Sequence, residues 1–497
     1  MSFMDVVANV NSAINGVVWG PPMLILMGFV GILMTILTKF FQVSHIKHWL
    51  KHTIGGIFTS KHVTSHTEDK SISQFQALCT ALAATVGTGN IVGVASAIAT
   101  GGPGAVFWMW VIAFFGMMTN YSENVLGIFY RIKNADDEWS GGAMYYLKNG
   151  LGAKKGCKGI GRFLAGLFAV FCLLASFGIG NMTQVNSISA NLNSAFGIPG
   201  WVTGIILMAA VGFVVIGGLK RIARTTEKIV PFMVVLYLLG SIVIILTHIT
   251  LIPAAFGSIF RGAFAMQSVA GGIVGFGVKQ AVVMGMKRGV FSNEAGLGSS
   301  VMVHSNSNVK EPVRQGMWGI FEVFADTIVV CTLTAVCIIV SGDIDIATGQ
   351  VISGVDTASL ASAAFGAMFG KVGEMFIAIA ILLFAFSTVL GWSHYGSKAC
   401  EYMFGLKGTT VYKFIFTVAT FGGAVMGQNL AWDIADTLNG LMAIPNLIGV
   451  LTLSGTVAAI TKNYVDRNLR GLDVEPMLSA YDDIQKEQEE ALKNHVE

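Results

Sequence analysis

Glycines interrupt the middle of a long apolar run, where they could expose backbone groups to a small polar molecule. Residues 73–100 read SQFQALCTALAATVGTGNIVGVASAIAT and are long enough to cross a bilayer. A helix broken inside hydrocarbon frees N–H and C=O groups that lipid cannot satisfy, and a ligand or an ion usually does so. The run therefore predicts a transporter. Its expected substrate contacts are Gly87, Thr88, Gly89 and Asn90.

The chemistry of this break suits an amino acid. A substrate carboxylate binds well to free N–H groups at the N-terminus of a half-helix, where the helix dipole is positive. Its ammonium group needs carbonyl or side-chain oxygens. Gly87 leaves room for the carboxylate, whereas an acidic side chain there would suit an amine. Amino acids are therefore favoured over biogenic amines.

Two later segments carry side chains that could complete the site. Phe177, Asn181 and Gln184 are spaced by four and three residues, which places them on one helical face. Gln184 offers a donor and an acceptor, and Phe177 offers a wall. Helix packing and interhelical hydrogen bonds are the alternative roles for these residues. Trp392 could close the pocket or anchor packing.

Acidic residues inside apolar runs need a partner or a role, because an unpaired charge in a membrane is costly. Asp326 lies in the run 316–341 and is a candidate for an ion path; Glu123 could be one too, or could pair with basic loops. Asn293 and Glu294 resemble a gate or a loop-fixing element more than a site at the membrane midplane.

Several function classes are excluded. Residues 87–93 match the G-x-G-x-x-G pattern, but the pattern lies within a membrane run and not after a strand, so a dinucleotide site is rejected. No phosphate-binding loop or hydrolase motif occurs. The six cysteines are scattered. We expect no enzyme activity, no cofactor and no nucleic-acid partner, and an ion gradient as the energy source.

Composition indicates an all-α polytopic membrane protein, with 54% hydrophobic and 12% charged residues. Apolar runs of sufficient length predict eleven transmembrane helices. They cover residues 22–42, 76–100, 104–130, 162–190, 200–218, 227–248, 264–287, 316–341, 373–396, 410–427 and 437–461.

Basic residues predict the orientation. With the N-terminus outside, nearly all Lys and Arg side chains fall in inner connections, Lys287 and Arg288 among them, and only Arg261 and Lys371 fall outside. Asp436 is then expected on the outer side. The C-terminal tail is expected in the cytoplasm.

One extra helix followed by ten suggests two inverted halves of five, each beginning with a discontinuous helix. The predicted parts are residues 1–72 (first helix and cytoplasmic linker), 73–250, 251–462 and the tail 463–497. The second break is expected in 264–287, at Gly271, Gly272, Gly275 and Gly277, with Gly271 and Gly272 as substrate contacts. Glycines that serve only close helix packing are the alternative.

Several motifs resemble the alanine/glycine:cation symporter family over about residues 15–465. They are ATVGTGNIVGV at 84–94, TNYSEN at 119–124, GGAMYY at 141–146, GIGNMTQVNS at 178–187, RGVFSNEAGLGS at 288–299 and GWSHYG at 391–396. The resemblance implies a sodium-coupled carrier of small neutral amino acids, with the fold of the bacterial leucine transporter and one additional helix.

The resemblance also implies a sodium site made of two adjacent hydroxyls and carbonyls of the broken helix. Here these are Ser387, Thr388 and the carbonyls of Ala83 and Val86, and uncharged hard oxygens suit a monovalent cation. We expect alternating access by a monomer surrounded by lipid in a bacterial inner membrane. Proton coupling through Asp326 and an amino-acid sensor without transport stay open as alternatives.

Overall fold

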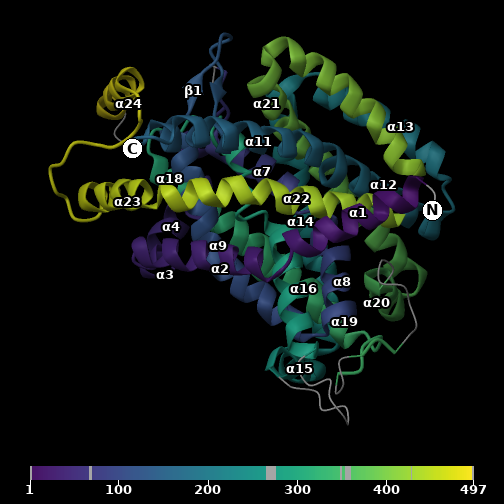
Figure 1. Ribbon diagram of the computed structural model, residues 1–497. Helices are drawn as coiled ribbons and strands as arrows, with labels where there is room; N and C mark the ends of the chain where they lie inside the picture. Colours follow the sequence, from purple (N-terminus) through teal and green to yellow (C-terminus); the bar gives the residue numbers. More distant parts are fainter. Residues whose placement is uncertain are drawn as a thin grey trace.

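The computed structural model describes residues 3–66, 70–264, 276–346, 350–352, 360–426 and 428–494. Helices dominate this part of the chain (Figure 1). The one sheet in these ranges is a hairpin in which β1 (Ile132–Lys133) pairs antiparallel with β2 (Trp139–Ser140).

The helices follow one another with short connections. In the first part they are α1 (Phe3–Val18), α2 (Pro21–Leu37), α3 (Phe41–Ser44), α4 (Ile46–His52), α5 (Ile54–Thr59), α6 (Lys61–Thr64), α7 (Gln74–Thr85), η1 (Thr88–Asn90), α8 (Val92–Gly101), α9 (Gly104–Phe129), α10 (Ala143–Tyr145), η2 (Tyr146–Gly150), η3 (Leu151–Ala153), α11 (Lys158–Phe177), η4 (Gly178–Met182), α12 (Thr183–Phe196), α13 (Gly200–Val215) and α14 (Gly218–Thr247). They continue with η5 (Ile249–Leu251), α15 (Ile252–Phe264), α16 (Phe276–Asn293), α17 (Val301–His304), α18 (Pro312–Val323), η6 (Phe324–Cys331), α19 (Thr332–Val340), α20 (Leu360–Phe369), α21 (Lys371–Val425), α22 (Gln428–Thr452), α23 (Ser454–Asn468) and α24 (Asp482–Asn494).

Seven helices of the described part are long and apolar enough to cross a membrane, or eight if a bent pair counts as one span. This confirms a polytopic helical membrane protein. Two of the expected runs lie within α21, where Gly405 leaves the helical conformation at φ 72° and separates two helices. The total of eleven spans and the inverted repeat stay predictions.

The first predicted break is confirmed. Helix α7 begins with a capping box, in which the Ser73 hydroxyl accepts from the backbone N–H of Gln76 and the Gln76 amide accepts from that of Ser73. The helix ends at Thr85, and after the short η1 turn the chain continues as α8 in a direction bent by 58°. Because glycine and a short polar segment occupy the bend, the interruption falls where the sequence places it.

The described residues contain another interruption, directly after α16, which is called the second break below; the predicted one, at Gly271, Gly272 and Gly275, lies outside the described residues. Helix α16 runs without interruption across Gly277, and the chain leaves the helix only at Glu294, to resume at α17. Glu294 has φ 57°, and Gly296 has φ 92°. Gly298, with φ 71°, adds another left-handed conformation, which glycine adopts without strain. The predicted contacts Gly271 and Gly272 lie outside the described residues.

Glycines of α16 serve close packing. A Cβ at Gly289 would lie 2.7 Å from Cγ2 of Ile112 on α9, and one at Gly285 would lie 2.7 Å from Cβ of Trp108 and meet the Ala105 carbonyl. A Cβ at Gly277 would meet nothing within 4 Å. Gly285 and Gly289 therefore permit close contact between α16 and α9, whereas Gly277, the one described glycine of the predicted break, faces open space.

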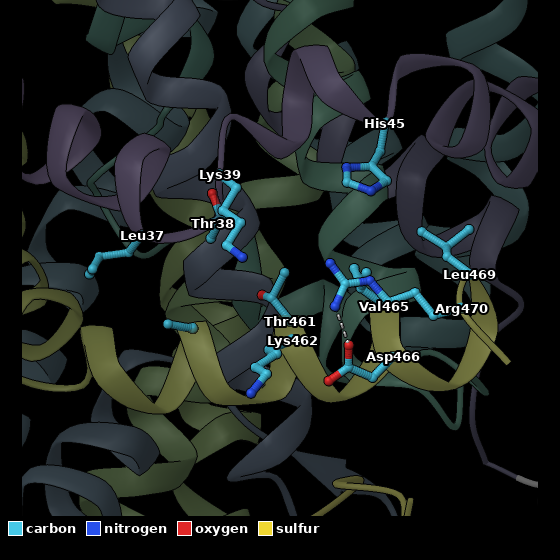
Figure 2. Close-up of a pocket in the computed structure, with 11 residues that line it drawn as sticks. Leu37, Thr38, Lys39, His45, Thr461, Lys462, Val465, Asp466, Leu469 and Arg470 are labelled. Carbon is cyan, nitrogen blue, oxygen red and sulfur yellow. Dashed lines mark hydrogen bonds and ion pairs between the residues drawn. The ribbon is translucent and has the colours of Figure 1, made fainter. Parts of the chain in front are cut away.

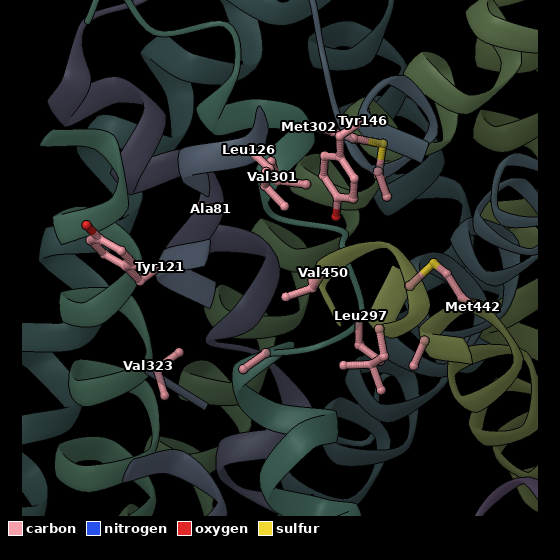
Figure 3. Packing of buried hydrophobic residues seen from close by; sticks show 14 of the residues in the cluster. Ala81, Tyr121, Leu126, Tyr146, Leu297, Val301, Met302, Val323, Met442 and Val450 are labelled. Atoms are coloured by element: carbon pink, nitrogen blue, oxygen red, sulfur yellow. The ribbon is translucent and has the colours of Figure 1, made fainter. Parts of the chain in front are cut away.

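The chain of the second break is itself part of the core. Figure 3 shows Leu297 of this segment near Met442 and Val450 of α22, within the same cluster as Val301 and Met302. Leu297 is fully buried. Burial of this apolar side chain stabilises an irregular segment that has few backbone hydrogen bonds of its own.

An additional helix precedes the predicted first span. Helix α1 packs along α22 (Figure 1). The Asn15 amide donates to the Thr437 hydroxyl at 3.0 Å, and the Trp19 indole donates to the Asp436 carbonyl at 2.8 Å. Helix α2 then begins with Pro21 in its first turn, as helix starts favour.

Charged side chains correct one part of the predicted orientation. The Lys287 ammonium lies 2.7 Å from the Asp436 carboxylate, and Arg288 lies 3.4 Å from it. These residues were expected on opposite sides of a membrane whose apolar core is about 30 Å thick. The placement of Lys287 and Arg288 on the inner side together with Asp436 on the outer side is therefore wrong, because the three side chains form one largely buried ion-pair cluster.

Other charges do gather at one end of the bundle. Arg467 of α23 forms a two-pronged ion pair with Glu311 at 2.8 and 2.9 Å, and Lys133 of β1 pairs with Glu487 of α24 at 3.2 Å. Lys398 pairs with Glu401 at 2.9 Å. These segments were all assigned to the same side of the membrane.

We predict that Gly285→Val destabilises the protein by about 1–3 kcal/mol, because the side chain would force α16 away from α9. Gly277→Val is the matched control and should change stability by less than about 0.5 kcal/mol, since its position is open. Thermal unfolding of the purified proteins in one detergent measures both. Equal stability of the two variants would contradict the packing role.

Candidate binding site

Side chains hold the backbone of the first break in place. The Gly87 N–H donates to Oδ1 of Asn90 at 2.9 Å, and the Thr88 N–H donates to Oε1 of Gln184 at 3.3 Å. Asn90 and Thr88 are fully buried. The structure thus brings four of the sequence-predicted residues together, with side-chain oxygens on two N–H groups at the break, and the Thr88 hydroxyl has no hydrogen-bond partner in the described part of the chain.

Asp326 joins the two breaks. Its Oδ1 accepts from the Asn90 amide at 2.6 Å, and its Oδ2 accepts from the hydroxyl of Ser292, beside the second break, at 2.8 Å. The Thr327 hydroxyl donates to Oδ2 at 2.7 Å. Because both carboxylate oxygens accept hydrogen bonds, this buried acidic group is satisfied without a cationic side chain.

The two breaks also touch through their backbones. A Cβ at Gly89 would lie 3.2 Å from both Cδ1 of Phe291 and Cα of Ser292. Glycine is the residue that permits this close approach. Helix termini from two different segments therefore meet at one place in the interior.

Trp392 has a polar contact with the second break. Its indole N–H donates to Oε1 of Glu294 at 2.7 Å, and the Ser299 hydroxyl donates to Oε2 of the same carboxylate at 2.6 Å. The ring is fully buried, and a Cβ at Gly180 would collide with it. Trp392 thus fixes Glu294 as well as filling space.

The candidate sodium ligands lie together. The hydroxyls of Ser387 and Thr388 lie 2.8 and 3.0 Å from the Phe384 carbonyl, to which each can donate its proton. The Ser387 oxygen lies 3.3 Å from the Ala83 carbonyl oxygen. A Cβ at Gly87 would meet the Thr388 hydroxyl. Hydroxyl oxygens whose protons are donated elsewhere keep lone pairs free for a cation.

The backbone at Val86 fits the same arrangement. Val86 ends α7 with ψ 86°, outside the helical conformation, and its side chain is buried. Its carbonyl is thereby taken out of the regular helical direction. Uncharged hard oxygens in a buried place suit a desolvated monovalent cation.

Phe177 and Asn181 make contacts of the packing kind. The Phe177 ring lies 5.5 Å from that of Tyr412 and 5.8 Å from that of Phe416. The Asn181 amide donates to the Phe416 carbonyl at 2.8 Å, while its Oδ1 is buried without a partner in the described part of the chain. Both residues thus link η4 and its neighbouring helix to the second half of α21.

Sequence reasoning did not place Ser292 in the site and assigned Asn293 and Glu294 only a peripheral role. Asn293 donates to the Thr327 hydroxyl at 3.0 Å and accepts from the Ala295 N–H at 3.0 Å. The available signal was the motif SNEAGLGS at 292–299, where polar residues stand directly before glycines that break a helix.

Glu123 also acts on the second break. The Asn446 amide donates to Oε1 of Glu123 at 2.5 Å and to the Gly296 carbonyl at 2.9 Å. Asn446 therefore connects α9, α22 and the irregular segment. This contact favours the structural reading of Glu123 over an ion path.

A cover of aromatic and charged groups lies beside the site. Phe291, which touches the Gly89 position, stacks on Trp432 with ring centroids 5.6 Å apart. The Arg288 guanidinium lies 5.6 Å from the Phe291 ring. Arg288 and Lys287 in turn form ion pairs with Asp436. The aromatic side chains of Phe291 and Trp432 are thus next to the break, and the charged cluster of Lys287, Arg288 and Asp436 is next to the aromatic side chains.

Known proteins resemble this chain over most of its length. Residues 4–477 match the model of the sodium:alanine symporter family. The sodium/alanine symporter AgcS of Methanococcus maripaludis is 45% identical over 461 residues, which cover 93% of this chain and 98% of that protein. The amino-acid carrier protein AlsT of Bacillus subtilis is 36% identical over 82% of this chain and 83% of its own.

A solved structure supports the fold alone. MhsT in complex with L-phenylalanine aligns with a TM-score of 0.52 at 13% identity, covering 80% of this chain and 99% of that chain. The architecture is therefore of the bacterial leucine-transporter type.

We predict that Asp326→Asn destabilises the protein by about 1–3 kcal/mol, because an amide group would turn N–H groups towards donors that now meet a carboxylate. Asp343→Asn is the control, since Asp343 lies in a half-buried turn where it accepts from Ser341 at 3.1 Å. Thermal unfolding compares the two. Unchanged stability of Asp326→Asn would show that the two breaks are not held together by this side chain.

Proposed function

The chain belongs to the sodium:alanine symporter family, and we propose that it is a sodium-coupled symporter that imports small neutral amino acids, alanine and glycine, by alternating access. Membership of a transporter family, together with the apolar helices, makes it a multi-pass membrane protein. The substrate, the coupling ion and the transport cycle are the proposed parts.

The observation that carries the proposal is the meeting of two broken helices beside a cluster of buried oxygens. The N–H groups of Thr88 and Gly89 lie at the start of η1, where a substrate carboxylate would take the place of the Gln184 oxygen that now accepts from Thr88. Gln184 and the Thr88 hydroxyl supply polar side chains next to it. A zwitterion finds partners for its carboxylate here, and oxygens for its ammonium group.

A small substrate is favoured by the crowding at this place. Gly87 lies against the Thr388 hydroxyl and within 3.3 Å of Gln184, measured to the Cβ that it lacks. Trp392 is fixed by Glu294 and cannot swing away without breaking that hydrogen bond. Additional methylene groups in such a packed cavity cost about 1–3 kcal/mol.

Sodium is the proposed coupling ion, with Ala83, Val86, Ser387 and Thr388 as its ligands. These groups provide oxygen atoms without a fixed negative charge. Asp326, the residue on which a proton-coupled alternative depends, is instead occupied by three donors and anchors the breaks. We therefore favour sodium over protons as the coupling ion.

The proposed architecture has a first span followed by two inverted halves of five. We place α7/α8, α9, α11/α12, α13 and α14 in the first half. The second half comprises α16/α17, α18/α19, the two parts of α21, and α22. Contact between α8 and α16, and between α9 and α18, supports this arrangement, because each joins matching helices of the two halves.

Counterflow in proteoliposomes tests the function. Vesicles loaded with unlabelled alanine should accumulate labelled alanine when sodium is present, and much less when choline replaces sodium. Unlabelled glycine should compete and leucine should compete at least about tenfold more weakly, as the crowding requires. Sodium-independent accumulation would overturn the proposed coupling, and a protein that binds alanine without exchange would be a sensor.

We predict that Ser387→Ala with Thr388→Ala raises the half-saturating sodium concentration of alanine uptake at least about tenfold, because the ion loses two oxygen ligands. Ser393→Ala is the matched control, since this hydroxyl donates to a carbonyl of the same helix at 2.6 Å and has no place in the site. An unchanged sodium dependence in the double variant would refute the assignment.

We also predict that Gly87→Ala reduces the apparent affinity for alanine at least about fivefold, because the methyl group would occupy the space between Thr388 and Gln184. Gly93→Ala serves as the control, because its nearest neighbour is the Thr88 carbonyl at 4.0 Å. Both variants are measured by uptake at saturating sodium. If the two retain equal affinity, the substrate lies away from Gly87.

A further inference from the structure

A pocket separate from the two breaks lies where α2 ends against α23 (Figure 2). Its volume is about 230 Å³. The residues that line it are Leu37, Thr38, Lys39, His45, Ala458, Thr461, Lys462, Val465, Asp466, Leu469 and Arg470. Both elements thus contribute apolar side chains and cationic groups to the lining.

The charges of the pocket leave a positive surplus. Lys39 and Lys462 are exposed and form no ion pair in the described part of the chain. Arg470 is paired with Asp466 at 2.9 Å. Burial, and after it the charge of Arg470, lowers the pKa of His45, so the ring adds no charge near neutral pH. Two unpaired ammonium groups therefore remain.

The local backbone places Lys39 at the pocket. Lys39 and Phe40 both adopt the left-handed conformation, with φ 57° and 56°, which is uncommon for residues other than glycine. The turn reverses the chain between α2 and α3. Figure 2 shows Lys39 and Arg470 reaching towards the same hollow from two different elements.

Exposed apolar residues indicate the depth in the membrane at which the pocket lies. On α2, the side chains of Ile25, Phe29, Ile32 and Ile36 are exposed at helical spacing and suit contact with acyl chains. Beyond Lys39, the short helices α3 and α4 expose Phe40, Val43 and Ile46 next to polar residues. An apolar stripe that turns into such a mixed segment is typical of the headgroup region.

We propose that this pocket binds the phosphate-bearing headgroup of an anionic glycerophospholipid, in the leaflet on the side of the C-terminal tail. The phosphate would lie between Lys39 and Lys462. The start of the lipid chains would lie on Leu37 and Leu469. Basic pockets between membrane helices bind lipid headgroups through this combination of charge and apolar surface. A bound lipid would join the first span to α23 and the tail.

The test is a titration of the purified full-length protein in a neutral detergent with fluorescent phosphatidylglycerol. Lys39→Gln with Lys462→Gln should lower its apparent affinity about thirtyfold, because each lysine near a membrane surface contributes about fivefold. Lys47→Gln with Lys486→Gln removes the same charge from exposed positions outside the pocket and should lower it less than about twofold.

Thermal unfolding and competition with glycerol 1-phosphate, a soluble anion without acyl chains, complete the test. The thermal unfolding temperature without lipid should be unchanged in both double variants, since neither lysine of the pocket has an ion-pair partner in the described part of the chain. If a double variant is less stable, the single variants Lys39→Gln and Lys462→Gln replace it, and each should lower the apparent affinity for phosphatidylglycerol about fivefold. Equal losses in the two double variants, or no loss, would overturn the proposal. Displacement of phosphatidylglycerol by equimolar glycerol 1-phosphate would do so too, by showing a site for soluble anions.

Discussion

Asp326 receives hydrogen bonds from both interrupted segments of the chain, and the interior of the protein depends on this one carboxylate. Asn90 and Ser292 come from helices that are separated by about 200 residues of sequence. Each would lose a hydrogen bond in an apolar surrounding if its own segment moved away from Asp326. Asn90 in turn holds the Gly87 N–H, so the geometry of the proposed substrate site follows from the same contact.

The sequence allows the break at Gly87 to be predicted, whereas the interruption that the structure describes after α16 was not expected, for a physical reason. At Gly87 the glycines coincide with polar residues and with a change of helix direction. In α16, Gly285 and Gly289 permit contact with α9, so glycine alone does not distinguish packing from interruption. The second break is marked by Ser292, Asn293 and Glu294, polar residues whose partners come from distant helices and are not visible in a local pattern.

The charge pattern fails at Lys287 and Arg288 for a related reason. The rule that basic residues collect on the inner side describes charges that face water. These two side chains are mostly buried and are neutralised by Asp436, on a helix about 150 residues away. Local spacing also fails to reveal the partners of Phe177. Its spacing with Gln184 predicts a shared helical face, but its ring packs on Tyr412 and Phe416.

The contacts around Gly87 divide its neighbours into two groups, and this division bears on how ion and substrate can be coupled. On one side, α7 contacts α21 through Ser387 and Ala83 and contacts α14 through Thr80 and Thr226, whose hydroxyls lie 3.0 Å apart. On the other side, Asn90 and α8 are held by Asp326 and α16. The proposed cation ligands thus lie on the α7 side of the bend and the anchored donors on the α8 side. A cation that draws the Ser387 and Thr388 oxygens towards Ala83 and Val86 would fix the angle at Gly87, and with it the N–H groups offered to a carboxylate. Coupling then requires no long path, because the two ligands share one bend in the backbone.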